Sequence, residues 1–395
     1  MKKLFCFAVL ILLMVSLAFL CEYNIRDAGF VDLDPQPYWL YFYVGDDIQE
    51  ESISYFQEVS QLSLQYSNIR VQIINIANQN DSRAMDYFRF WNIESLPALI
   101  LVSPDQRSLH LPLPDKGRIK KSIWLELDRT LTSSVREEIL DNIVKAFAVI
   151  LLIEGQYPAE NRLALETVEQ ASRKISSMMS QLPKRIENPP HIIILSPKIF
   201  NEEKILLWSL DINEEDLLEP HIVVLFGRGR ILYNPIIAAD LTVPDLVDML
   251  ILLGLSCDCG LDKRGLMGRR LPANWDEKMQ AEVVKHLGFD AENPMILREI
   301  AGILSTNNFD EENMDSLNGS PREISLYRER AITFAQKFGS TRISPAQAWA
   351  LNSQTPPSTD SGFQTSLGLI LGGFLILILL SGAVYIRLRA KQMRK

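Results

Sequence analysis

Cysteine and histidine are scarce in this chain of 395 residues, and their spacing excludes several common kinds of site. One of the four cysteines, Cys6, lies in an apolar N-terminal stretch, so the other three are too few for a disulfide framework. The four histidines stand far apart, and no two of them have the spacing of metal ligands. Zinc-protease, nucleophile-elbow and P-loop motifs are also missing. The sequence therefore predicts no bound metal, no cofactor and no hydrolase site.

Positive charge is also in short supply. The chain has 40 lysines and arginines against 49 aspartates and glutamates, for a net charge of -9. The basic residues form no stripe in the central region, which argues against nucleic acid as a partner. With 47% hydrophobic and 23% charged residues, the composition is typical of a globular protein.

The N-terminal 21 residues have the order of features found in a signal peptide. Lys2 and Lys3 precede an uncharged apolar stretch, Leu4 to Leu20, and the small residue Ala18 suits cleavage. Two alternatives stay open. Cys21 could carry a lipid, although Leu20 occupies a position where lipoproteins have a small residue, or the stretch could remain as an uncleaved anchor.

A second apolar stretch near the C-terminus predicts one transmembrane helix within residues 363–386. Leu367 to Ile386 carries no charge, and the basic tail 387–395 that follows indicates a cytoplasmic C-terminus. We therefore expect a single-pass protein of the cell membrane, with most of the chain extracytoplasmic (periplasmic in a Gram-negative cell). Gly368 and Gly372 form a GxxxG pattern through which two such helices could dimerise.

The central region alternates between strand-like and helix-like hydrophobic patterns, and the alternation occurs twice. The predicted organisation is a signal peptide or N-terminal anchor at 1–21, one α/β domain at 36–133, another at 144–256, a helical extension at 257–340, a tether at 341–362, a transmembrane helix at 363–386 and a basic tail at 387–395. The tether is rich in proline, serine and threonine. The fold class is thus α/β with a helical C-terminal extension.

The two halves match best where a helix leads through a short loop to a proline and an apolar strand. In the first half, Trp91 and Ile93 precede Pro97 and the strand ALILV; in the second, Trp208 and Ile212 precede Pro220 and HIVVLF. This pattern resembles the thioredoxin fold, in which a cis-proline opens an antiparallel hairpin. The resemblance implies two tandem thioredoxin-like domains with Pro97 and Pro220 as cis-proline candidates, Pro220 being the weaker match.

No cysteine occupies the segment in which redox-active members of that fold carry Cys-x-x-Cys. The corresponding residues are 45–51 in the first half and 154–158 in the second. The preferred interpretation is therefore a redox-inactive, non-enzymatic binding or scaffold protein that meets a protein partner in or at the membrane. One alternative is an accessory subunit of a transporter or envelope complex. Another is a thiol–disulfide oxidoreductase or isomerase that uses the only thiol pair, Cys257 and Cys259.

The thiol pair also permits a structural role or half of a metal site. The glycine-rich segment that follows it carries four basic residues, Lys263, Arg264, Arg269 and Arg270. These could bind phosphate, acidic lipid headgroups or an acidic partner, because arginine forms bidentate bonds to such anions. A solvated basic loop is the alternative.

Overall fold

The computed structural model describes residues 23–33, 36–77, 82–113, 118–182, 184, 186–255 and 268–305. Within these residues, no helix combines the length and apolar character needed to cross a membrane. The predicted signal segment with Cys21, the tether, the transmembrane helix with Gly368 and Gly372, and the basic tail all lie outside the described residues.

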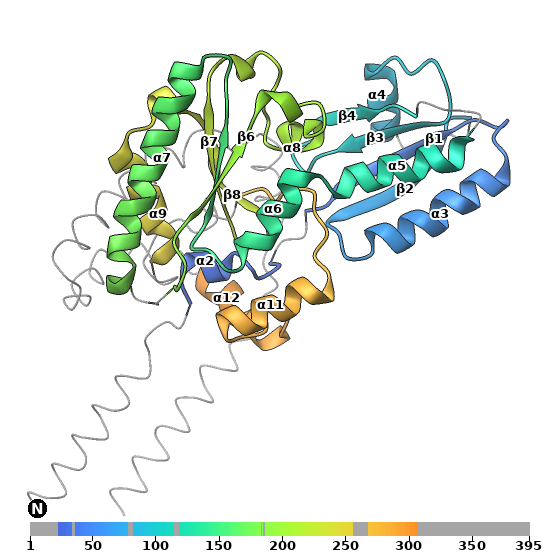
Figure 1. The fold of residues 1–395 in the computed structure, drawn as a ribbon. Helices are drawn as coiled ribbons and strands as arrows, with labels where there is room; N and C mark the ends of the chain where they lie inside the picture. The colour runs from blue at the N-terminus through green and yellow to red at the C-terminus, as the bar shows by residue number, and fades with distance from the viewer. Residues whose placement is uncertain are drawn as a thin grey trace, which may run out of the picture. The chain divides into compact units, whose positions relative to one another are not determined.

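The first sheet has strand order β2-β1-β3-β4, with β1 parallel to β2 and antiparallel to β3. Its elements, in chain order, are β1 (Tyr38–Val44), α3 (Glu50–Leu64), β2 (Ile69–Asn75), α4 (Ser82–Phe90), β3 (Ala98–Val102), β4 (Ser108–Leu111) and α5 (Ile119–Leu131). Side chains of β1 alternate between two clusters: Phe42 packs with Phe56 on the α3 and α5 side, and Tyr43 packs with Met85 on the α4 side. The sheet is therefore covered on both faces (Figure 1).

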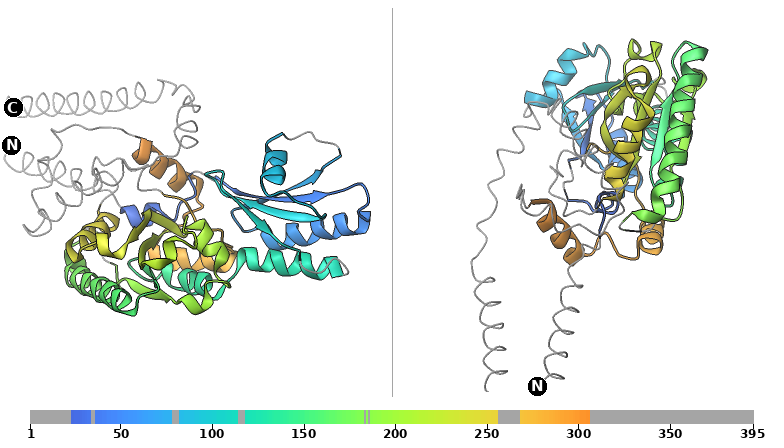
Figure 2. Two further views of the ribbon diagram at one scale, coloured as in Figure 1. Left: turned by 90° about the horizontal axis from the view of Figure 1, so that it is seen from above. Right: turned by 90° about the vertical axis from the view of Figure 1, so that its left-hand side faces the viewer.

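The second sheet repeats this topology, with strand order β6-β5-β7-β8 and β5 parallel to β6. Its elements are β5 (Val149–Ile153), α7 (Pro158–Met178), β6 (His191–Leu195), α8 (Lys204–Ser209), β7 (His221–Phe226), β8 (Arg230–Ile237) and α9 (Val243–Gly254), with short 3-10 turns at Met179–Gln181, Pro197–Ile199, Asp216–Leu218 and Ala238–Asp240. The helices α7 and α9 lie side by side on one face (Figure 2). Both sheets thus have the strand order and helix placement of a thioredoxin-like fold.

The second domain recruits residues from outside the range 144–256 that the sequence predicts for it. The helices α6 (Ser134–Ile143), α11 (Glu277–Leu287) and α12 (Pro294–Ser305) pack against the face opposite α7. The short helix α2 (Ile25–Ala28) joins the clusters of both faces, with Ile25 on the α7 side and Ala28 on the opposite side. The helices α11 and α12 agree with those expected in the C-terminal extension. The helices α2 and α6 were not expected from the sequence: α2 has only four residues, too few for a periodic pattern.

Local signals explain where these helices start and stop. Asp276 accepts a hydrogen bond from the main chain of Met279 at the start of α11, and Gly288 ends that helix in the left-handed conformation with φ 79°. At the start of α9, Thr242 and Asp245 form a reciprocal capping box.

Candidate functional site

In the first domain, the end of β1, the start of α3 and the proline loop meet as the resemblance implied. The Leu96–Pro97 peptide bond is cis. A Cβ added to Gly45 would lie 3.2 Å from a methyl group of Leu96, which places the proline loop against the end of β1. The side chains here are carboxylates instead of thiols: Asp46 accepts a hydrogen bond of 3.0 Å from the amide of Asn75.

The second domain differs at the same place. Glu219–Pro220 is not among the cis peptide bonds, so the expectation of a second cis-proline is wrong. Here the loop is longer and contains the 3-10 turn Asp216–Leu218. The main-chain N–H of Gln156 donates a hydrogen bond of 3.0 Å to the carbonyl of Leu218. The two segments are so close that a Cβ on Gly155 would lie 2.6 Å from that carbonyl oxygen, so the main chain itself fills the space beside Pro220.

A shallow cleft of about 330 Å³ lies next to this contact, at the N-terminus of α7. Apolar and acidic side chains share its lining: Tyr157, Glu215, Asp216, Leu218, Glu219, His221 and Ile237. His221 is buried, and its Nδ1 lies 2.9 Å from the carbonyl oxygen of Glu219. The cleft contains no thiol, and no cluster of ligands that could hold a metal occurs in the described part of the chain. Its lining contains no group that would react with a disulfide.

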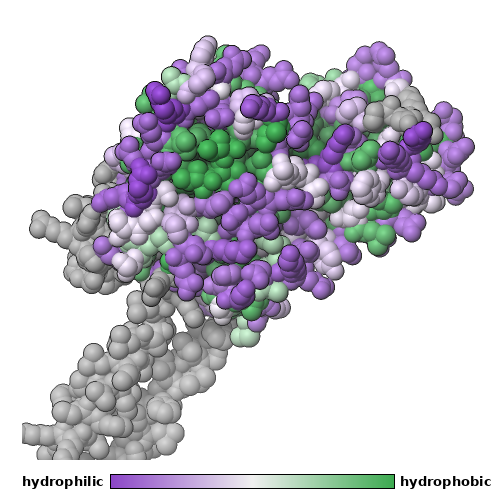
Figure 3. Space-filling model, in the orientation of Figure 1, coloured by the Kyte–Doolittle hydropathy of each residue, from purple (hydrophilic) through white to green (hydrophobic). Residues whose placement is uncertain are grey.

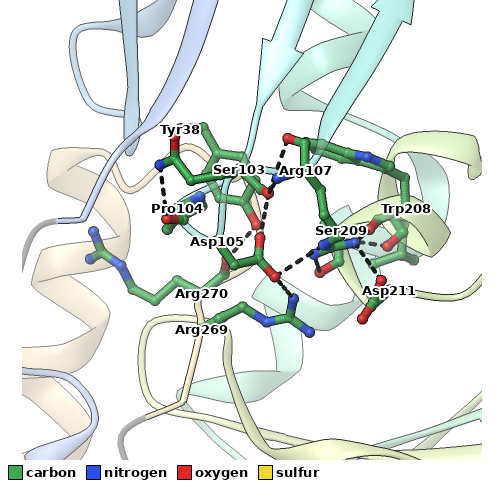
Figure 4. A network of polar contacts seen from close by, with 12 residues as sticks. Tyr38, Ser103, Pro104, Asp105, Arg107, Trp208, Ser209, Asp211, Arg269 and Arg270 are labelled. Carbon is green, nitrogen blue, oxygen red and sulfur yellow. Dashed lines mark hydrogen bonds and ion pairs between the residues drawn. The ribbon is translucent and has the colours of Figure 1, made fainter. Parts of the chain in front are cut away.

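A polar cluster lies between the two domains, around the turn that joins β3 to β4 (Figure 4). Arg107 donates from Nε to Asp105 over 3.0 Å, and its guanidinium also donates to the main-chain oxygen of Trp208 in the second domain. The same guanidinium lies 3.1 Å from the carboxylate of Asp211 and 5.6 Å from the centre of the Trp208 ring. Arg107 therefore links the β3–β4 turn of the first domain to α8 of the second.

Asp105 is the centre of this interdomain network. Its carboxylate also accepts hydrogen bonds from Ser103 and from Arg269, and its side chain is only 12% exposed. Burial by itself would raise the pKa of Asp105, but the guanidiniums of Arg269 and Arg107 and the Ser103 hydroxyl outweigh it and lower the pKa. The carboxylate is thus held in its charged form between two cations.

Two of the predicted anion-binding residues belong to this network. Arg269 pairs with Asp105, and Arg270 lies 3.2 Å from the carboxylate of Asp32; both arginine side chains are 11% exposed. The main-chain oxygen of Arg270 accepts a hydrogen bond of 2.8 Å from Tyr38, whose pKa is raised by burial. These two arginines have carboxylate partners inside the chain.

The other predicted site residues, Cys257, Cys259, Lys263 and Arg264, lie outside the described residues. Asp105, Arg107 and Trp208 were not predicted as site residues from the sequence. No local pattern identifies them, because their partners are far away along the chain: Arg269 is separated from Asp105 by 164 positions.

The fold is thioredoxin-like, and neither of the two sheets has cysteines at the position that redox-active members of the fold use. No family model matches the sequence, and no curated protein matches it. Among solved structures, the chain is similar to the first two thioredoxin domains of Saccharomyces cerevisiae Eps1p, with 10% identity, 52% of this chain and 86% of that chain covered, and a TM-score of 0.19.

It is also similar to the zinc-bound form of human ERp44, with 10% identity, 51% of this chain and 49% of that chain covered, and a TM-score of 0.20. Full-length ERdj5 is similar with 9% identity, 51% of this chain and 29% of that chain covered, and a TM-score of 0.19. This chain thus spans about half of ERp44 and less than a third of ERdj5. The strand order, the helix placement and the cis Leu96–Pro97 bond are the features that make the fold thioredoxin-like.

Proposed function

We propose that this chain is a non-enzymatic binding or scaffold protein, anchored in a membrane with its two thioredoxin-like domains on the extracytoplasmic side. The observation that carries the proposal is the structure at the start of α7. There the thiol position is occupied by Gln156 and Tyr157, and a main-chain hydrogen bond to Leu218 closes the space beside Pro220. A substrate disulfide has no nucleophile to meet at this place.

The first domain supports the same conclusion. The start of α3 follows Asp46 and Asp47, and the first turn of the helix contains Glu50 and Glu51. Negative charge disfavours a thiolate and disfavours the approach of one from a substrate. The geometry of the fold is retained at the cis-proline, while the chemistry that the fold elsewhere supports is absent at both helix starts.

A protein partner would then bind at surfaces such as the cleft at α7. Its lining pairs the carboxylates of Glu215, Asp216 and Glu219 with apolar side chains, of which Leu218 is 46% exposed. A protein segment that carries both basic and apolar side chains complements this lining in charge and in hydrophobicity.

The first test is a turnover assay. The purified full-length protein in detergent is assayed for reduction of insulin and for reactivation of scrambled ribonuclease, beside a Cys257→Ser/Cys259→Ser double variant. We expect neither protein to exceed the uncatalysed rate. Turnover by the natural chain that is lost in the double variant would overturn the proposal in favour of a thiol–disulfide enzyme.

The second test concerns the cleft. Fluorescence anisotropy of a labelled peptide of alternating lysine and leucine should show binding that weakens several-fold in Glu219→Gln. The matched control is Glu166→Gln, an exposed carboxylate on α7 that does not line the cleft. Equal effects of the two substitutions would mean that the peptide senses only net charge, and the cleft would then not be the binding surface.

A further inference from the structure

The free edge of the second sheet combines an exposed apolar side chain with main-chain groups that have no partner among the described residues. Among the strands that the structure describes, β6 pairs with β5 only. His191 donates to the carbonyl of Ala148, and Leu195 accepts from Glu154, so the odd-numbered residues of β6 bond toward β5. Because main-chain groups alternate along a strand in a parallel pair, the N–H and C=O groups of Ile192 and Ile194 point away from the sheet.

The same two residues supply an apolar surface. Ile194 is 44% exposed, and Ile192 is partly buried against the cluster that lies under α7. Figure 3 shows a continuous apolar patch over β6, surrounded by hydrophilic side chains. A charged residue on the strand is one of the devices that protect exposed edge strands from pairing, and none of the five side chains of β6 is a lysine, arginine or carboxylate. Apolar patches with a polar rim mark interaction surfaces.

We propose that β6 pairs with β6 of a second copy of this chain, antiparallel, about a two-fold axis at Ile193. This register sets Ile192 opposite Ile194 of the second copy and Ile194 opposite Ile192. Each such pair exchanges both of its main-chain hydrogen bonds, so every outward-pointing group of the two residues is satisfied. A two-fold contact of this kind is closed and self-complementary.

Two further features favour a second copy over a longer foreign strand. Pro190 and Pro197 flank β6, and because proline has no N–H, pairing cannot continue past the strand at the first of them. The charges at the two ends are opposite: Glu138 lies 3.3 Å from His191 at one end, and Lys198 follows the other end. Antiparallel pairing brings each Glu138 toward Lys198 of the other copy, whereas parallel pairing would bring like charges together.

The test measures self-association of the full-length chain in nanodiscs or a neutral detergent, by light scattering coupled to size exclusion. Gly368→Leu and Gly372→Leu are included in every sample, so that a contact between transmembrane helices cannot hold the dimer. We expect a dimer that Ile194→Lys weakens at least ten-fold, while Leu62→Lys leaves it unchanged. Leu62 is the matched control because it is an exposed leucine, 64% exposed, on α3 of the first domain.

A mixing experiment distinguishes a specific contact from loss of folding. Ile194→Lys and Ile194→Glu chains with different tags should co-purify from a mixture, because residues two positions apart across the axis lie roughly 7–8 Å from each other, within reach of an ion pair. Unchanged thermal melting of each variant checks the fold. Hydrogen exchange at the amides of Ile192 and Ile194 should be slow in the dimer and fast in the Ile194→Lys monomer.

Three results would overturn the proposal. A dimer that Ile194→Lys does not weaken is held by another surface. A monomer with fast exchange at Ile192 and Ile194 has a free edge. A monomer with slow exchange at these amides has its edge covered by another segment of its own chain.

Discussion

Removing the charge of Asp105 should loosen the junction between the two domains. The substitution Asp105→Asn keeps the size of the side chain and leaves Arg269 and Arg107 without their shared carboxylate. Arg269 is 11% exposed and Asp105 is 12% exposed, so the loss leaves a nearly buried cation unpaired. Breaking a buried pair by removing one partner costs about 3–5 kcal/mol, and because Arg107 is 24% exposed and keeps Asp211 we expect a cost of about 3 kcal/mol.

The control is Asp86→Asn, which breaks the surface pair of Asp86 and Arg89. Their side chains are 71% and 62% exposed, and an exposed pair is worth about 0–1 kcal/mol. Urea unfolding of the full chain, followed by tryptophan fluorescence, compares the two variants, and hydrogen exchange at β4 and α8 locates the loss. Equal shifts of the unfolding midpoint for the two variants would mean that the buried ion pairs of Asp105 contribute no more to stability than the exposed pair.

The pH dependence gives an independent check. Because the folded protein lowers the pKa of Asp105, the network adds stability above the ordinary pKa of 3.8, and this stability is lost as the pH falls through the lower folded value. The difference in midpoint between the natural chain and Asp105→Asn should therefore be constant near neutral pH and shrink below about pH 3.8. A difference that does not change with pH would mean that the ion pairs contribute nothing and that only packing was disturbed.

Four other substitutions follow from the same structure and can be measured by the same unfolding assay. Gly155→Ala should destabilise by about 1–3 kcal/mol, because its Cβ would press on main chain, whereas Gly302→Ala, in a helix with open space around it, should stabilise by about 0.5–1 kcal/mol. Tyr38→Phe should cost about 1 kcal/mol through the lost bond to Arg270. This substitution should also reduce the loss of stability at alkaline pH. Burial raises the pKa of Tyr38 in the folded protein, so the neutral phenol stabilises the folded state below the ordinary pKa of 10.0, and this contribution is lost as the pH rises beyond that value. Arg136→Ala should cost about 3 kcal/mol or more, because this buried guanidinium donates to main-chain oxygens at the end of α5 and to Pro272.

The order of strands and helices in each domain could be predicted from the sequence because it depends on local patterns. Strands such as Tyr38–Val44 and Ala98–Val102 are short apolar stretches between turn residues, and the longer helices show helical periodicity. The cis bond at Pro97 was implied by the residues around it and is present. Pro220 shows the limit of such transfer, because a loop with its own 3-10 turn gives that proline a different environment.

The junction between the domains could not be predicted, because it depends on contacts between distant segments. Residues 268–277 lie between the two domains: Leu271 accepts a hydrogen bond from Asn68 of the first, and its N–H donates to Gly229 of the second. Arg269 and Arg270 read as a basic loop in the sequence, and only their folded neighbours Asp105 and Asp32 show that the two charges are paired. Sequence patterns identify charged residues but carry no information on partners this far apart.

The junction also limits which surfaces remain for a partner. The turn of the first hairpin, Ser103 to Arg107, binds α8 of the second domain through Arg107. Only the other end of that hairpin, at the cis Leu96–Pro97 bond, stays unused by this contact. Because a surface that holds two domains together cannot serve a partner without separating them, the proposed binding function depends on the cis-proline end of the first domain and on the cleft at α7 of the second. Variants that loosen the junction, such as Asp105→Asn, should therefore leave peptide binding at the cleft unchanged, and a loss of binding in that variant would show that the junction itself is part of the binding surface.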